Sequence, residues 1–303
     1  MVSVGLPRAL FHHEFGTLFE TFFHHAGAAV EVSPHTTREI LDLGVSSAVD
    51  ETCLPVKIYY GHARWLSERV DAVFVPRVVS ICPREYTCPK FLGLPDMIKR
   101  ALRGRAICSP LVDVRRRGAS LYDALVSAAF ELGLDERTAR GAMRSAVSRQ
   151  RAMVAAMREA PKGKGPAVAV LGHRYLISDA LSGMDVKQRL QALGLTVYDY
   201  HMVPESALFR IQQRVHRPAF WTYENKILAA AIWYMSQRKV DGIIQWVSFG
   251  CGPDSMVGEV VARECRQREV PHMLVTVDEH TGTAGVQTRL EAFSDMVFWR
   301  RGK

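Results

Sequence analysis

The feature that most constrains the fold is a regular alternation of short apolar strands with helical segments. In the first half the sequence predicts strands over 2–6, 28–32, 70–79 and 106–109, with helices over 11–26, 36–48, 53–67 and 92–102. After residue 166 it predicts strands over 167–171, 196–200, 242–249 and 272–277, with helices over 185–193, 221–237, 255–268 and 285–294. Strands separated by helices of this length form parallel sheets with helices on their faces. We therefore predict an α/β fold made of two Rossmann-like domains with parallel sheets.

A segment of different composition separates the two halves. Residues 120–159 are rich in Ala, Arg, Met and Leu, contain no Pro and are interrupted only by Gly133-Leu134-Asp135, which predicts a helical hairpin. The run PKGKGP at 161–166 is typical of a flexible linker. The predicted domains are an N-terminal α/β domain over 1–115, a helical hairpin and linker over 116–165, and a C-terminal α/β domain over 166–303.

Composition and charge narrow the class of protein. The 303 residues are 48% hydrophobic and 23% charged, as in globular proteins, and no apolar run is long enough to span a bilayer. Because the N-terminus also lacks a secretory signal pattern, we expect a cytoplasmic protein without a membrane partner. The net charge is +8, but no nucleic-acid-binding motif accompanies the basic residues at Arg115–Arg117 and over 137–158. We expect no nucleic-acid partner, and interpret these bases as a solvated face or a surface for an acidic partner.

Three cysteines stand one or two residues ahead of a proline, where a loop is predicted to turn into a helix: Cys53, Cys88 and Cys251. Proline is favoured at the first helical position, and the helix dipole there favours the thiolate form of a preceding cysteine. Thiolates bind soft metals and clusters, and a cytoplasmic setting argues against a disulfide framework. In parallel α/β sheets such as those predicted above, ligands bind beyond the carboxyl ends of the strands. We therefore predict one iron–sulfur cluster in the cleft between the domains.

Other ligand sets remain open. A structural zinc site usually presents a local C-x2-C pair, and none occurs in the sequence. Cys82 could supply a fourth ligand, although it shares a loop with Cys88, and we expect Cys108 and Cys265 to be structural. If only three cysteines bind a cluster of four irons, one iron has no protein ligand and can bind a substrate as a Lewis acid.

A polar loop follows the predicted strand over 272–277. Its residues Asp278-Glu279-His280 precede the run TGTAG, and such a loop could cradle an anion or place an acid or base near the cluster. Glu279 and His280 are therefore weak catalytic candidates. A surface turn with a helix cap is an equally good interpretation.

Several long motifs carry a family resemblance. The runs GLPRALF, DETCLPVK, EYTCPKFLGLPDMI, GCGPDS and DEHTGTAGVQTRLEAF resemble those of acyl-CoA dehydratase activase-related proteins. These proteins resemble, more distantly, the 2-hydroxyacyl-CoA dehydratase subunits and the double-cubane cluster proteins. The resemblance spans Val4 to Met296, except for 115–165. It implies an oxygen-sensitive cluster, [4Fe–4S] or of the larger double-cubane type, held by Cys53, Cys88 and Cys251 in an anaerobic protein.

The resemblance also implies a function. The chain would take low-potential electrons from an ATP-dependent activase and reduce or dehydrate a small substrate, such as an acyl-CoA, at an open cluster iron. The chain has no phosphate-binding loop of its own, so the activase would be a separate partner. The alternatives are a non-enzymatic electron carrier or cluster-delivery protein, and a zinc-stabilised binding module. The substrate and the cluster nuclearity stay open. The oligomeric state also stays open, with a homodimer as one of the options.

Overall fold

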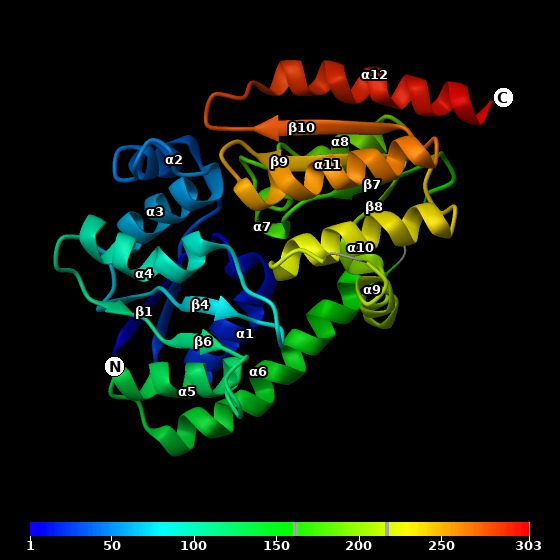
Figure 1. The fold of residues 1–303 in the computed structure, drawn as a ribbon. Helices are drawn as coiled ribbons and strands as arrows, with labels where there is room; N and C mark the ends of the chain where they lie inside the picture. The colour runs from blue at the N-terminus through cyan, green and yellow to red at the C-terminus, as the bar shows by residue number, and fades with distance from the viewer. Residues whose placement is uncertain (160, 162, 216–217, 303) are drawn as a thin grey trace. The chain divides into compact units, whose positions relative to one another are not determined.

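The computed structural model describes residues 1–159, 161, 163–215 and 218–302 (Figure 1). The chain divides into two compact units. The first unit comprises 1–155 together with 220–222, and the second comprises 156–219 and 223–303. The division falls inside a long helix, between Ala155 and Ala156. The predicted linker over 161–166 includes Lys162, which lies outside the described residues.

The first unit is built on a four-stranded parallel sheet in the order β2-β1-β3-β5. Its strands are β1 (Ser3–Leu6), β2 (Ala29–Val32), β3 (Ala72–Phe74) and β5 (Ile107–Cys108). Its helices are α1 (His12–His25), α2 (Arg38–Val45), α3 (Leu54–Leu66), α4 (Pro89–Ala101), α5 (Leu121–Glu131) and most of α6 (Glu136–Met157). The predicted parallel α/β architecture is confirmed.

The single strand predicted over 70–79 is wrong. The chain forms β3, turns at Pro76 and continues as β4 (Arg77–Ser80), which pairs with β6 (Leu111–Asp113) in a separate two-stranded parallel sheet. The neighbouring segment contains Pro110 between β5 and β6, so a proline interrupts each of the two adjacent segments. Since proline donates no hydrogen bond to a ladder, the sheet breaks there and a new pair begins.

Aromatic side chains from α1 fill the core of the first unit. Phe19 and Phe23 both meet Phe74 of β3 edge-on, with ring centroids 5.1 Å apart in each pair. Phe22, one residue before Phe23, is also fully buried. These contacts explain the helical spacing of phenylalanines seen in the sequence, because α1 buries one face against the sheet.

The second unit has its own parallel sheet, in the order β10-β9-β7-β8, with helices on both faces (Figure 1). Its strands are β7 (Ala167–Leu171), β8 (Thr196–Tyr198), β9 (Gly242–Ser248) and β10 (His272–Val277). Its helices are α7 (Arg174–Ile177), α8 (Val186–Ala192), the 3-10 turn η1 (Tyr200–Met202), α9 (Glu205–Gln212), α10 (Thr222–Ser236), α11 (Gly252–Gln267) and α12 (Thr283–Arg301). None of the described helices is long and apolar enough to cross a membrane.

The order of strands in this second sheet positions the functional groups. β7 and β9 are adjacent and parallel, with Leu171 beside Gln245 in the register. Their carboxyl ends therefore lie at the same edge of the sheet. Beyond β7 the chain enters the short helix α7, and beyond β9 it enters α11. The starts of these two helices are thus brought close together.

Candidate functional site

The three cysteines that precede prolines all begin helices, as predicted. Cys53 is the N-cap of α3, Cys88 the N-cap of α4 and Cys251 the N-cap of α11, each with proline in the first two helical positions. All three thiols are partly exposed, and none forms a disulfide. The helix dipole and the unpaired N–H groups of each first turn favour the charged thiolate.

The cysteines are shared between the two units. Cys53 and Cys88 belong to the first unit, in which α3 and α4 pack against each other, whereas Cys251 belongs to the second. That the three bind one cluster remains a prediction. Cys82 lies in the turn after β4, where its carbonyl oxygen accepts a hydrogen bond of 2.7 Å from the Ser80 hydroxyl.

The two cysteines expected to be structural are buried. Burial raises the pKa of the Cys108 thiol to about 12 and that of the Cys265 thiol to about 11. Both therefore stay neutral and behave as small apolar side chains.

The loop after β10 forms a closed turn. The Thr281 hydroxyl lies 2.7 Å from one Asp278 carboxylate oxygen, and the His280 amide donates to that same oxygen at 3.0 Å. The hydrogen bond from Thr281 is the main reason that the pKa of Asp278 lies below its usual range. His280 is exposed and Glu279 half-buried, and the chain then enters α12 at Thr283. Their proposed catalytic role stays a prediction.

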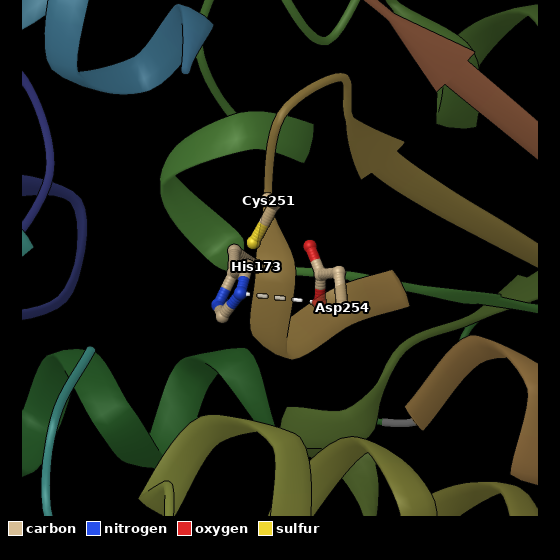
Figure 2. Close-up of side chains that lie close together, drawn as sticks. All are labelled: His173, Cys251 and Asp254. Carbon is tan, nitrogen blue, oxygen red and sulfur yellow. Dashed lines mark ion pairs between the residues drawn. The ribbon is translucent and has the colours of Figure 1, made fainter. Parts of the chain in front are cut away.

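A group that the sequence did not predict surrounds Cys251. One ligand atom each from His173, Cys251 and Asp254 lies within 4.8 Å of the other two (Figure 2). His173 is the N-cap of α7, and Asp254 lies in the first turn of α11. The adjacency of β7 and β9 therefore brings together two chain segments that are far apart in sequence.

A second carboxylate completes the group. Nε2 of His173 lies 3.2 Å from Asp254 Oδ1 and 3.5 Å from Oε1 of Glu224, a residue in the first turn of α10. None of these three residues exposes more than 5% of its surface. The ring of Tyr175 stacks on the His173 imidazole at 4.7 Å, and Tyr223 meets the imidazole edge-on at 5.6 Å. The aromatic rings thus fix the orientation of the imidazole.

Charge and burial oppose each other in this group. Burial by itself would lower the pKa of His173, but the Asp254 carboxylate, assisted by Cys251 and Glu224, raises that pKa well above its ordinary value. Burial also raises the pKa of the Cys251 thiol, and the neighbouring His173 opposes this rise.

Several polar atoms in this group make no hydrogen bond. Within the described residues, both ring nitrogens of His173, Oε1 of Glu224 and Oδ2 of Asp254 are buried and have no partner of hydrogen-bonding geometry. Buried polar atoms in native proteins are nearly always paired, and an exception calls for an explanation such as an absent ion. The donor set of sulfur, nitrogen and carboxylate oxygen is one that can hold a transition metal.

Comparison with known proteins places the chain in a family. The family model described as "CoA enzyme activase uncharacterised domain (DUF2229)" matches residues 3–203. The chain belongs to this family. The match includes Cys53, Cys88 and His173, and it ends before Glu224, Cys251 and Asp254. No curated protein matches the chain.

Solved structures are similar only at a low level. The SBP FpvC of Pseudomonas aeruginosa in complex with Mn2+ is 14% identical, with 99% of both chains covered and a TM-score of 0.28. Glutamate racemase of Francisella tularensis, in complex with D-glutamate, is 10% identical over 98% of this chain and 83% of its own, with a TM-score of 0.22. The laminin-binding protein of Streptococcus agalactiae is 10% identical over 98% and 99%, with a TM-score of 0.25. These scores are too low to support an argument about function.

The sequence did hold a signal for part of the missed group. His173 follows the predicted strand over 167–171 after a single glycine, and Asp254 follows Cys251 by three residues within the run GCGPDS. Both positions lie just beyond the carboxyl ends of strands, where ligands of parallel sheets collect. Glu224 lies inside a predicted helix, and no local pattern distinguishes it from a solvated acid.

Proposed function

We propose that this chain is an iron–sulfur protein that works with a CoA enzyme activase, and that Cys53, Cys88 and Cys251 bind its cluster. The observation that carries the proposal is the shared setting of these cysteines: each caps the start of a helix that opens with proline. A structural role for the thiols would not require the same electrostatic setting three times, whereas cluster ligation requires thiolates.

The donor chemistry suits such a cluster. The three cysteines are partly exposed, so they can reach a ligand, and each stands at a helix start, where main-chain N–H groups stabilise negative charge. At Cys251 burial opposes this effect and raises the pKa of the thiol, with His173 acting in the other direction. When bound, a [4Fe–4S] or larger cluster would supply one-electron transfer, and an iron without a protein ligand would bind an oxygen of a small substrate, such as an acyl-CoA. The chain's own residues would hold the three thiolates, and the main-chain N–H groups at the helix starts would stabilise their negative charge.

The partner follows from the family and from the charge of the chain. The family description names a CoA enzyme activase, which supports an ATP-dependent activase as the electron donor. The net charge of +8 would steer an acidic partner. Arg115 is held by Asp113 at 2.8 Å and lies over the Tyr86 ring at 3.9 Å, and Arg116 also pairs with Asp113, at 3.5 Å. The exposed Arg117 is therefore the better docking residue of that run.

The first test is metal analysis of protein purified without oxygen. We expect iron together with acid-labile sulfide, and loss of both when Cys53, Cys88 or Cys251 is changed to Ala. Cys265→Ala is the matched control, because Cys265 lies in α11, the helix that Cys251 caps, but is buried and is not a proposed ligand. Stoichiometric zinc without sulfide would contradict the proposal and favour a zinc-stabilised module.

The second test separates an enzyme from an electron carrier. We expect an activase to reduce the cluster only when ATP is supplied, and Cys82→Ala to leave the cluster unchanged. Equal reduction with and without ATP would instead favour a simple redox protein. Loss of the cluster in Cys82→Ala would make Cys82 a fourth ligand and favour a closed electron carrier.

A further inference from the structure

We propose that His173, Glu224, Cys251 and Asp254 form a binding site for one divalent transition-metal ion of the zinc class. The site lies wholly within the second unit and needs neither Cys53 nor Cys88. The ion would bind when Cys251 does not ligate a cluster. The Cys251 thiol would then be a ligand of the cluster in one form of the protein and of the divalent ion in another. This inference therefore goes beyond the proposed cluster function and rests on a separate observation.

The spacing of the donor atoms fits a single tetrahedral ion. Zinc lies about 2.0–2.2 Å from nitrogen and oxygen ligands, which puts two such ligands of a tetrahedron about 3.4 Å apart. His173 Nε2 lies 3.2 Å from Asp254 Oδ1 and 3.5 Å from Glu224 Oε1. The Cys251 sulfur lies within 4.8 Å of the His173 and Asp254 atoms, so it would supply the remaining corner once the side chains draw in around an ion.

Unpartnered buried atoms point to a missing cation. Among the described residues, His173 Nδ1 and Asp254 Oδ2 are buried with neither a hydrogen bond nor an ion pair. His173 Nε2 and Glu224 Oε1 lie 3.5 Å apart as an ion pair, but without hydrogen-bonding geometry. The two carboxylates share a single imidazole as their ion-pair partner in this part of the chain. Two buried carboxylates with one imidazole between them leave oxygen lone pairs open, and buried carboxylates are normally paired or coordinate metals. A divalent ion would bind those open lone pairs.

The identity of the donors selects the class of ion. One thiolate, one imidazole and two carboxylates suit zinc, cobalt or ferrous iron, whereas calcium and magnesium prefer oxygen ligands alone. Binding would release the Cys251 thiol proton and require a neutral imidazole. Of the four residues, Cys251 is half-buried and the other three are buried.

The test uses a full-length variant that cannot assemble the proposed cluster. Cys53→Ala/Cys88→Ala protein, stripped with a chelator, is titrated with Co2+, whose thiolate bond gives a near-ultraviolet charge-transfer band. We expect one Co2+ per chain, the band, displacement by Zn2+ and a rise in Tm with Zn2+. Adding Glu224→Gln or Asp254→Asn should weaken Co2+ binding at least about tenfold. Adding Cys251→Ser should remove the band.

The control is Glu259→Gln, because Glu259 lies on the same helix α11 but is exposed and pairs with Arg266. Binding of Co2+ without a thiolate band, or equal weakening in Glu259→Gln, would overturn the proposal and indicate adventitious metal. So would unchanged binding in the Glu224 and Asp254 variants. These outcomes do not touch the cluster proposal, which is tested by iron and sulfide in the unmodified chain.

Discussion

Gly61 of α3 lies against Ile40 of α2 so closely that a Cβ on Gly61 would come within 1.9 Å of the Ile40 carbonyl oxygen. The contact is reciprocal, because a Cβ on Gly44 of α2 would lie 2.0 Å from the carbonyl oxygen of Lys57 in α3. The two glycines thus let the main chains of the helices touch. This crossing fixes α3, the helix whose N-cap is Cys53.

Gly61→Ala should therefore be strongly destabilising. The new methyl would meet main chain rather than a movable side chain, so we expect the free energy of unfolding to fall by about 3 kcal/mol. Gly93→Ala is the control, since Gly93 lies in α4 and an added Cβ meets nothing within 4 Å. That change should stabilise by about 0.5–1 kcal/mol. Urea unfolding of both variants checks this, and similar midpoints would refute the crossing.

Much of the fold could be predicted from the sequence. The strands over 167–171 and 272–277 were predicted to the residue, because each is an apolar run with clear polar or Gly/Pro boundaries. The break at Pro76 and the three-residue strand β6 were missed, since so short a strand carries no periodicity. The short elements α7, η1 and α9 were missed for the same reason.

The candidate site was predicted only where its signal is local. A proline after a cysteine marks a helix start, so the positions of Cys53, Cys88 and Cys251 followed from neighbouring residues. The meeting of His173 with Asp254 depends on β7 and β9 being adjacent in the sheet. Strand order is decided by packing over the whole unit, and no local pattern encodes it.

His62 should make the stability of the protein depend on pH. It is fully buried beside Thr36, with 3.0 Å between its Nε2 and the Thr36 hydroxyl, and burial lowers the pKa of His62 to about 3. Between about pH 6 and 3 the unfolded chain binds a proton at this position and the folded chain does not. The free energy of unfolding should therefore fall by about 1.4 kcal/mol for each pH unit of acidification in this window.

Chemical unfolding measured at several pH values between 6 and 3 checks this slope. His62→Gln, which does not titrate, should show a shallower dependence than the unmodified chain. An unchanged slope in His62→Gln would show that other groups account for the acid sensitivity.

Asp199 should stabilise the second unit as a buried anion. One of its carboxylate oxygens accepts a 2.8 Å hydrogen bond from the His201 amide, and the other pairs with the Lys187 ammonium. Burial would raise the pKa of Asp199, but His201 and Lys187 outweigh it and hold that pKa well below its usual range. A carboxyl group whose folded pKa is depressed stabilises the fold above its unfolded pKa of about 3.9, and loses that contribution as the pH falls through the folded pKa.

Asp199→Asn should lower the free energy of unfolding by about 2–4 kcal/mol at pH 7, because it leaves the partly buried Lys187 without its counter-ion. Asp42→Asn is the control, since Asp42 pairs with Arg38 on the exposed face of α2, where such a pair contributes less than about 1 kcal/mol. The deficit of Asp199→Asn should also shrink as the pH is lowered from 4 towards 2, because in this range the Asp199 carboxylate of the unfolded chain binds a proton while that of the folded chain stays charged. Equal stability of the two variants at pH 7, measured by urea unfolding, would show that the Lys187–Asp199 pair adds nothing beyond a surface ion pair.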